Sequence, residues 1–294
     1  MFLEVSVAFP HLGISFENLR KSVNLFGVEV AFYGIIIAIA IATGYCVAQY
    51  QAKRTGQDSE LYLDFAMYVI VACIIGARLY YVIFSWEDYR YNLAQIFNLR
   101  AGGLGIYGAV ITAIVVAIIY TRVKKIKFVT IADTGIAGLV VGQAIGRWGN
   151  FINREAFGGY TDSLFAMQIK RSEVYASTLK NDPAYLENSV FIDGVEYIQS
   201  HPTFLYESIA CFAILTLILL RTKTKKFEGE LFCIYLAGYG TARFFIESLR
   251  TDQLLLWKTN IPVSCLVSLV LAAAGYGTII YQFIKRKREA KKNG

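Results

Sequence analysis

Long apolar runs separated by short polar stretches dominate the pattern of this chain. Residues 30–50 and 61–84 form two such runs, and a third starts within the glycine-rich stretch 102–108 and ends at Tyr120. A helix needs roughly 20 mainly apolar residues to cross a bilayer. Four more runs follow, at 131–150, 201–220, 231–249 and 262–284. The pattern predicts an all-α polytopic membrane protein with seven transmembrane helices.

The polar stretches set the expected domain boundaries. Pro10, Gly13 and Gly27 interrupt any long period at the start of the chain, which indicates an irregular or short-helical lead. We expect an extracytoplasmic lead at 1–28, membrane helices one to four at 29–150 with a connector arm at about 85–104, a head at 151–200, membrane helices five to seven at 201–284, and a basic cytoplasmic tail at 285–294.

The longest polar stretch, 151–200, is expected to fold outside the membrane. Within it, Asp193-Gly194 separates two short apolar segments, at 190–192 and 195–198. An Asp-Gly pair between such segments favours a β-hairpin with a tight turn. This stretch therefore predicts a small α+β head.

Composition supports a membrane protein and argues against other classes. Of 294 residues, 56% are hydrophobic and only 17% are charged, which is too apolar for an ordinary soluble globule. The net charge of +7 comes from short clusters between apolar runs, so we do not expect a nucleic-acid partner. The five cysteines lie inside apolar runs and the chain has two histidines, so neither a metal site nor a cofactor is predicted.

Basic residues also predict the orientation. Dense clusters of Lys and Arg occur at 53–54, 122–127, 221–226 and 285–292, on alternate loops. Cytoplasmic loops carry such an excess. The head is therefore expected to face the extracytoplasmic side, and Arg147 to lie near the outer leaflet.

The fourth run ends in the densest group of candidate residues. Gly135, Gly138, Gly142 and Gly146 form a small-residue stripe that allows close helix packing. Arg147 follows the stripe, and Asn150 would share its face if the helix continued. Arg147 either reaches toward lipid headgroups or binds a substrate.

The sixth run carries a second polar group. Tyr239, Arg243, Glu247 and Arg250 fall within about 80° of one another on a helical wheel. Arg243 and Glu247 could form a structural ion pair. However, these arginines, with Arg147 and Arg78, amount to more positive charge than one glutamate balances, which favours an anionic ligand such as a lipid phosphate.

Two further segments offer candidate residues. His201, beside Pro202, is either a helix cap or a participant in the chemistry, and Glu207 lies one turn further along the fifth membrane helix. The stretch 102–108 either allows close packing or brings backbone to a ligand, since glycine has no side chain in the way.

These segments together resemble a known enzyme family. The motifs are Gly76-x-Arg78, Gly102-Gly103-Leu-x-x-Tyr107-Gly108, Gly146-Arg147-x-Gly149-Asn150-Phe151-x-Asn153-x-Glu155-x-x-Gly158, His201-Pro-Thr-x-Leu-Tyr-Glu207 and Tyr239-x-x-x-Arg243-x-x-x-Glu247-x-x-Arg250-x-Asp252, in that order after Tyr33. This set is similar to that of the bacterial prolipoprotein diacylglyceryl transferases.

The resemblance implies a function. Enzymes of this family transfer the diacylglyceryl group of phosphatidylglycerol to the thiol of the lipobox cysteine of preprolipoproteins, forming a thioether and releasing glycerol-1-phosphate. The implied location is the bacterial cytoplasmic (inner) membrane, with the active site on the extracytoplasmic side. Membrane lipids and the preprolipoprotein signal peptide would be the partners.

The resemblance also implies roles for individual residues. Many members have a histidine where this chain has Tyr107, so the resemblance does not assign the proton acceptor. The expected catalytic residues are Arg147, Arg243, Glu247 and Tyr107. The expected substrate-binding residues are Tyr33, Arg78, Gly102, Gly103, Asn150, Asn153, Glu155, Gly158, His201, Glu207, Tyr239 and Arg250.

Two other classes of function remain as alternatives. A seven-span anion or lipid transporter would also carry intramembrane arginines, but the two halves of the chain show no inverted repeat. An intramembrane hydrolase would need an activated nucleophile, and the sequence has no evident Ser-His or paired-aspartate arrangement.

Overall fold

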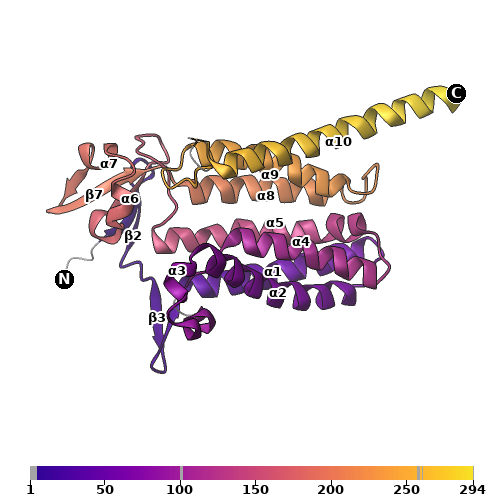
Figure 1. Ribbon diagram of the computed structural model, residues 1–294. Helices are drawn as coiled ribbons and strands as arrows, with labels where there is room; N and C mark the ends of the chain where they lie inside the picture. The colour runs from indigo at the N-terminus through magenta and orange to yellow at the C-terminus, as the bar shows by residue number, and fades with distance from the viewer. Residues whose placement is uncertain (1–4, 100–101, 257–258, 260, 294) are drawn as a thin grey trace. The chain divides into compact units, whose positions relative to one another are not determined.

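A computed structural model describes residues 5–99, 102–256, 259 and 261–293 of the protein (Figure 1). The chain divides into two compact units. The first combines Met1–Gly44 with Ile136–Gly294, and the second is Tyr45–Gly135. Two helices, α1 (Phe32–Arg54) and α5 (Phe128–Asn153), run from one unit into the other.

In the second unit, α2 (Glu60–Phe84) packs against α4 (Ile106–Val123). A Cβ atom added to Gly108 would lie 2.4 Å from the carbonyl oxygen of Gly76, so the two backbones touch without intervening side chains. The chain between these helices forms α3 (Trp86–Tyr89) and the 3₁₀ helix η2 (Leu93–Phe97). These short helices lie in the expected connector arm.

In the first unit, α9 (Glu230–Ser248) packs against α8 (Thr203–Arg221) and α10 (Val263–Asn293). Glycine again permits the contact, because a Cβ atom on Gly240 would lie 2.6 Å from the Ser268 carbonyl oxygen. On α1, a Cβ atom on Gly44 would lie 2.7 Å from the Gly138 carbonyl oxygen of α5. Of the predicted stripe on α5, Gly142 and Gly146 face α1 at ordinary contact distance, whereas no atom lies within 4 Å of a Cβ atom on Gly135.

Six helices among the described residues are long and apolar enough to span a membrane: α1, α2, α4, α5, α8 and α10. The protein is therefore a mostly helical, multi-pass membrane protein with a small sheet. The expected sixth span, α9, is not among the six helices. Its polar side chains, Arg243 and Glu247 among them, lower its hydropathy.

A five-stranded antiparallel sheet with the order β2-β1-β5-β7-β6 lies at one end of α8 and α9 (Figure 1). The expectation of an irregular or short-helical lead was wrong, because the first 28 residues contribute two of its strands. Val7 and Phe9 alternate with less apolar neighbours and are buried, so strand pairing covers them. The strands are β1 (Val5–Phe9), β2 (Ile14–Glu17), β5 (Met167–Lys170), β6 (Val190–Ile192) and β7 (Val195–Ser200).

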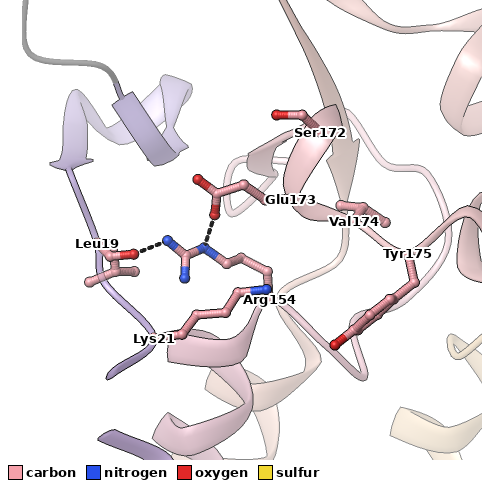
Figure 2. A pocket seen from close by; sticks show the side chains of 7 residues that line it. All are labelled: Leu19, Lys21, Arg154, Ser172, Glu173, Val174 and Tyr175. Carbon is pink, nitrogen blue, oxygen red and sulfur yellow. Dashed lines mark hydrogen bonds and ion pairs between the residues drawn. The ribbon is translucent and has the colours of Figure 1, made fainter. Parts of the chain in front are cut away.

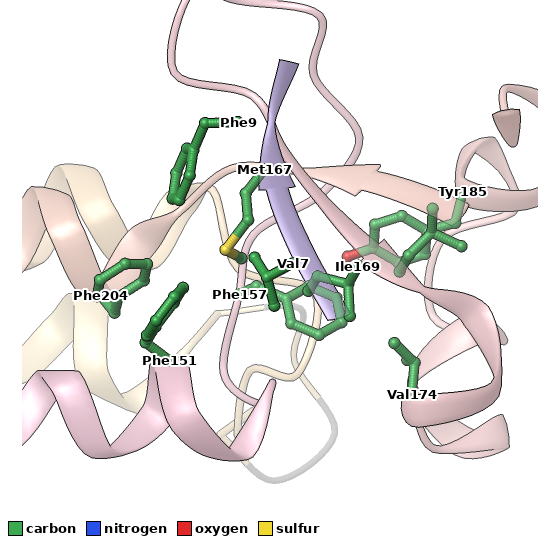
Figure 3. Close-up of a cluster of buried hydrophobic side chains, with 10 residues drawn as sticks. Val7, Phe9, Phe151, Phe157, Met167, Ile169, Val174, Tyr185 and Phe204 are labelled. Carbon is green, nitrogen blue, oxygen red and sulfur yellow. The ribbon is translucent and has the colours of Figure 1, made fainter. Parts of the chain in front are cut away.

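A core of buried apolar side chains holds this sheet on the helices. In Figure 3, Phe151 from the last turn of α5 and Phe204 from the first turn of α8 lie next to each other below Met167, with their rings tilted by 34°. Their ring centroids are 4.8 Å apart. The segments between α5 and α8 add the 3₁₀ helix η4 (Arg171–Glu173), α6 (Ala176–Leu179) and α7 (Ala184–Glu187).

Two hairpins have two-residue turns. The predicted hairpin at β6 and β7 is confirmed, with Asp193 and Gly194 at φ values of 51° and 79°. A second hairpin, β3 (Ser22–Leu25) with β4 (Val28–Ala31), forms a separate two-stranded sheet. A 3₁₀ helix, η1 (Pro10–Leu12), connects β1 to β2.

Two helices are longer than the sequence indicated. The fourth helix does not end at residue 150 but continues to Asn153. The last helix does not end at 284 but continues through the basic stretch to Asn293. This stretch contains Lys, Arg, Glu and Ala, which are good helix formers, and no glycine or proline before its last residue.

Candidate active site

Arg147 and Asn150 lie on one face of α5, as predicted for a helix that continues. Arg147 Nη1 donates to Asn150 Oδ1 over 3.4 Å, and Asn150 Nδ2 donates to Glu155 Oε1 over 3.1 Å. Asn153 is the last residue of the helix and is half-buried. The motif therefore forms a polar chain from the interior of α5 past its C-terminus.

Glu207 on α8 is the centre of the polar cluster in the first unit. Its side chain is only 2% exposed. One oxygen, Oε1, lies 2.8 Å from Arg147 Nη2 and accepts a hydrogen bond from Tyr239 Oη over 3.0 Å. The other, Oε2, accepts from Arg243 Nη1 over 2.8 Å. A single buried carboxylate thus joins α5, α8 and α9.

Glu247 completes the cluster on α9. Its Oε2 atom lies 2.5 Å from Arg243 Nη2, and its side chain is 4% exposed. The ion pair that the four-residue spacing suggested is therefore present. Arg243 contacts a different glutamate through each terminal nitrogen of its guanidinium, which fixes the plane of the group.

The expectation that positive charge exceeds negative charge at this site was wrong. Arg147 and Arg243 face the carboxylates of Glu207 and Glu247. Opposed charges stabilise one another in a low-dielectric interior. The glutamate on α8, Glu207, lies 36 residues from Arg243 in sequence. The residue pattern of α9 alone therefore does not include this second carboxylate.

Arg250 does not extend the polar stripe of α9, because the helix ends at Ser248. Its Nε and Nη2 atoms instead donate to the two carboxylate oxygens of Asp252, over 2.9 and 2.7 Å. Its backbone pairs with Gly158 in an isolated antiparallel bridge. Arg250 therefore secures the chain that follows α9.

Gly158 lies where several chain segments meet. Its N–H donates to the His201 carbonyl over 3.0 Å, and its own carbonyl accepts from Tyr185 Oη over 2.8 Å. A Cβ atom here would lie 2.8 Å from both His201 Cβ and the Leu249 carbonyl oxygen. Only glycine fits this position without displacing backbone.

His201 precedes α8 and belongs to this junction. Its Nδ1 atom lies 3.3 Å from Tyr206 Oη, and burial lowers the pKa of the imidazole below its usual value. The ring is therefore neutral at neutral pH. The N-cap of α8 is Pro202, and the His201 ring contacts a side chain of the helix, so the helix-cap interpretation of His201 was wrong.

Tyr33 begins α1 and packs on α5. A Cβ atom on Gly149 would lie 2.7 Å from Tyr33 Cδ2, so the ring lies directly on the helix backbone two residues after Arg147. Tyr33 is thus placed beside the motif on α5.

Arg78, Gly102 and Gly103 come together in the second unit. All five N–H groups of the Arg78 guanidinium donate to carbonyl oxygens of the connector arm, at 2.6 to 3.2 Å, and the residue is 5% exposed. The two glycines have φ values of 82° and 78°. A Cβ atom on Gly103 would lie 2.4 Å from Arg78 Nη1. The acceptors are the carbonyls of Gln95, Ile96, Asn98, Gly102 and Gly103.

Tyr107 lies in the first turn of α4, in the same unit. The centroid of its ring is 6.3 Å from that of Tyr80 on α2. Gly105, just before it, packs against Tyr80, with 2.7 Å from a Cβ atom to Tyr80 Cδ1. The turn that carries Tyr107 is thus held against α2.

The sequence analysis missed residues that support the arginine cluster. Gln143 Nε2 donates to Tyr235 Oη over 3.1 Å, and the rings of Tyr235 and Tyr239 stack with centroids 5.3 Å apart. Gln143 precedes Arg147 by four residues, and Tyr235 precedes Tyr239 by four. Extending each polar stripe by one helical turn would have found both residues.

A separate pocket of about 430 Å³ lies in the head (Figure 2). Arg154 crosses it, with Nε 2.5 Å from Glu173 Oε2 and a hydrogen bond from Nη2 to the Leu19 carbonyl. Lys21 extends over the ring of Tyr175, with Nζ 5.7 Å from its centroid. None of these residues belongs to the predicted site.

The geometry agrees with the comparison to known proteins. The family model for prolipoprotein diacylglyceryl transferase matches residues 21–281. The chain belongs to this family. The match includes every residue of the arginine cluster and every glycine of the motifs.

Curated relatives in the prolipoprotein diacylglyceryl transferase family cover nearly all of the chain. The phosphatidylglycerol–prolipoprotein diacylglyceryl transferase of Clostridioides difficile is 40% identical over 268 residues, which are 91% of this chain and 97% of the relative. The protein of the same name from Listeria welshimeri is 40% identical over 90% of each chain. That from Finegoldia magna is 38% identical over 93% of this chain and 98% of its own.

Proposed function

We propose that this protein transfers the diacylglyceryl group of phosphatidylglycerol to a cysteine thiol of a prolipoprotein. Membership of the family and the names of the relatives support the reaction. The observation that carries the proposal is the placement of Arg147 and Arg243 on one buried glutamate, Glu207. This arrangement holds two guanidinium groups in fixed orientations, as recognition of a lipid phosphate requires.

The reaction exchanges a carbon–oxygen bond for a carbon–sulfur bond. The thiolate of the lipobox cysteine attacks the glycerol carbon that bears the phosphate. The bond from that carbon to the phosphate oxygen breaks, and glycerol-1-phosphate leaves with the electron pair. The enzyme must therefore stabilise a phosphate anion and accept one proton from the thiol.

Arg147 is the better placed of the two arginines to contact the phosphate. Its side chain is 25% exposed, against 15% for Arg243. Its Nη1 atom donates to Asn150 over a long 3.4 Å, so a phosphate oxygen can replace that partner at little cost. Arg243, on α9, also stabilises the charge of the phosphate while it remains bound to Glu207 and Glu247.

Glu247 is our candidate for the proton acceptor. It contacts Arg243 through one oxygen, whereas Glu207 is held by three groups. A free thiol has a pKa near 8.5, and neighbouring guanidinium groups lower it, so a carboxylate suffices as a base. In this scheme Tyr107 positions the substrate through its phenol and does not accept the proton.

The remaining residues bind or position substrate. Arg78 acts indirectly, because its five donors hold the carbonyls that set the Gly102–Gly103 turn. Gly158 and Arg250 fix the segment that follows α9, and His201 packs against Tyr206 at the start of α8. Tyr33, Asn150, Asn153, Glu155, Glu207 and Tyr239 line or support the phosphate position.

We propose seven membrane spans, in which α9 is the sixth in chain order. Its 19 residues are close to the length that a membrane crossing requires, and it packs between α8 and α10, which can shield its charges from lipid. With the basic loops in the cytoplasm, the head and the arginine cluster face the extracytoplasmic side of the bacterial inner membrane. A lipobox cysteine delivered by a signal peptide reaches the cluster on that side.

One experiment tests the reaction. The purified protein is incubated with phosphatidylglycerol and a lipobox peptide, and the peptide is analysed by mass spectrometry. We expect a mass gain of one diacylglyceryl group on the cysteine, with release of glycerol-1-phosphate. A matched peptide with serine in place of cysteine should stay unmodified. An unmodified cysteine peptide alongside a correctly folded protein would refute the proposal.

A further inference from the structure

The β3–β4 hairpin has one face made entirely of apolar side chains. Residues directly opposite each other in an antiparallel pair point to the same side, and successive pairs alternate. The register places Val23 opposite Val30 and Leu25 opposite Val28 on one face. The other face carries the pairs Ser22 with Ala31 and Asn24 with Glu29. The hairpin is therefore amphipathic.

The tip of the hairpin extends the apolar face. Phe26 and Gly27 form the two-residue turn, with φ values of 52° and 84°. A bulky residue rarely adopts a positive φ, yet Phe26 does so with its side chain fully exposed, at 105%. Leu25 and Val28 beside it are 48% and 50% exposed. Three neighbouring apolar side chains thus lack a protein partner that would cover them within the described residues.

The opposite face satisfies its polar groups locally. Asn24 Oδ1 accepts the Gly27 N–H over 2.9 Å, and Ser22 Oγ donates to Glu29 Oε1 over 2.5 Å. Asn24 and Glu29 are exposed. This polar face is therefore suited to contact with water, whereas the apolar face is not.

The hairpin is attached to the start of a membrane span. Ala31 ends β4 and Phe32 begins α1, and the Phe32 N–H donates to the Lys21 carbonyl over 2.9 Å across the base of the hairpin. Strands of four residues reach only about 13 Å from this point. In Figure 1 the hairpin extends away from the five-stranded sheet of the same unit. The apolar face of the hairpin consequently lies close to the start of the span.

We propose that the β3–β4 hairpin is an interfacial membrane anchor. Phe26, Leu25 and Val28 insert into the boundary between headgroups and acyl chains of the leaflet on the head's side, while Asn24 and Glu29 face water. A two-stranded hairpin is marginally stable in water, and contact with lipid supplies the apolar burial that it lacks. The proposal rests on the membrane-spanning character of α1 and is independent of the transferase reaction.

The anchor has a consequence for the arginine cluster. It fixes the depth at which α1 enters the membrane, and Tyr33 in the first turn of α1 packs on Gly149 of α5. Arg147 lies two residues earlier on that helix. The hairpin therefore sets the height of Arg147 relative to the lipid headgroups.

Tryptophan substitutions test the anchor in the full-length protein. Leu25→Trp and Phe26→Trp are each reconstituted into phosphatidylcholine vesicles, with the emission of the three native tryptophans subtracted. We expect blue-shifted emission, at least twofold quenching by a nitroxide placed high on the lipid acyl chain, and weak quenching by acrylamide in water. Each variant must retain the melting temperature of the unsubstituted protein, so that the readout reports a folded molecule.

Two matched controls make the test specific. Asn24→Trp places the same probe on the polar face of the hairpin, and Phe191→Trp places it on β6 of the other hairpin, where the phenylalanine is 69% exposed. Both should be quenched by acrylamide and not by the lipid nitroxide. Equal lipid quenching at positions 24 and 25 would overturn the amphipathic insertion.

Two other outcomes would also contradict the insertion of the hairpin into the membrane. Acrylamide quenching at position 26 with no lipid quenching would show that the tip lies in water. Shielding of position 26 from both acrylamide and the lipid nitroxide would show that protein covers the tip, for example a second copy of the chain. Dilution of the protein with excess lipid would then restore quenching.

Discussion

Glu207 Oε1 lies 2.8 Å from Arg147 Nη2, and the carboxylate is 2% exposed. The same carboxylate accepts from Arg243 Nη1, so one acid on α8 orients an arginine from each of two other helices. Removing a single partner from such a buried group leaves uncompensated charge, which typically costs about 3–5 kcal/mol.

Glu207→Gln should therefore reduce both stability and activity. The amide keeps the size of the side chain but removes the charge that two guanidinium groups share. We expect a lower melting temperature in detergent and at least a tenfold loss of peptide modification. Glu196→Gln in the head is the matched control, since its pair with Arg171 is more exposed and should contribute little to stability. Full activity with an unchanged melting temperature would refute the anchoring role of Glu207.

Arg147→Lys should lose turnover without losing the fold. Lysine retains the positive charge but cannot offer the planar pair of donors that matches a phosphate. We expect a drop in kcat of at least tenfold, with the protein still inserted in the membrane and thermally stable. Arg243→Lys should act in the same direction, and Arg171→Lys on the head surface should have no effect. Normal turnover in either of the first two variants would exclude a bidentate role at that position.

Tyr107→Phe and Glu247→Gln separate two candidates for the proton acceptor. A tyrosine has a reference pKa near 10 and is a poor base at neutral pH. Tyr107→Phe should therefore retain much of the activity. Glu247→Gln should lose most of it, because the amide cannot accept the thiol proton. The opposite ranking across pH 6 to 9 would identify the phenol as the acceptor.

Cysteine labelling of intact cells tests the orientation. Ser163 in the head and Thr224 in the α8–α9 loop are both exposed, so a thiol at either position is accessible from its own side. Thr222 is unsuitable because it is buried. A membrane-impermeant reagent should modify Ser163→Cys and spare Thr224→Cys, with the unsubstituted protein as the background. Labelling in the reverse pattern would place the head in the cytoplasm.

Gly158→Ala should disrupt the junction between the head and the end of α9. The new methyl group would lie 2.8 Å from the Leu249 carbonyl oxygen, so backbone must move. We expect weaker activity and a lower melting temperature. Gly34→Ala is the control, because no atom lies within 4 Å of a Cβ at that position and its φ is not positive. Equal behaviour of the two variants would show that the junction tolerates the added methyl.

Much of the local structure could be predicted from sequence because it depends on short-range pattern. Apolar runs near 20 residues indicated the helices, and Asp193-Gly194 indicated the hairpin at β6 and β7. The four-residue spacing of Arg243 and Glu247 indicated their ion pair. By contrast, β1 and β2 were missed, since β1 pairs with β5 about 160 residues away, β2 joins the sheet only through β1, and the lead by itself shows only broken periodicity.

Sequence alone thus determined the helices, the residue types of the candidate site and the family resemblance. Tertiary structure decided which charges meet: Glu207 from α8 between Arg147 and Arg243, Arg250 with Asp252 beyond the end of α9, and Arg78 within backbone carbonyls. The physical reason is that a helix fixes neighbours three or four residues apart, whereas the partner across a helix interface depends on packing. Only the packed helices bring together the residues that neutralise a buried arginine.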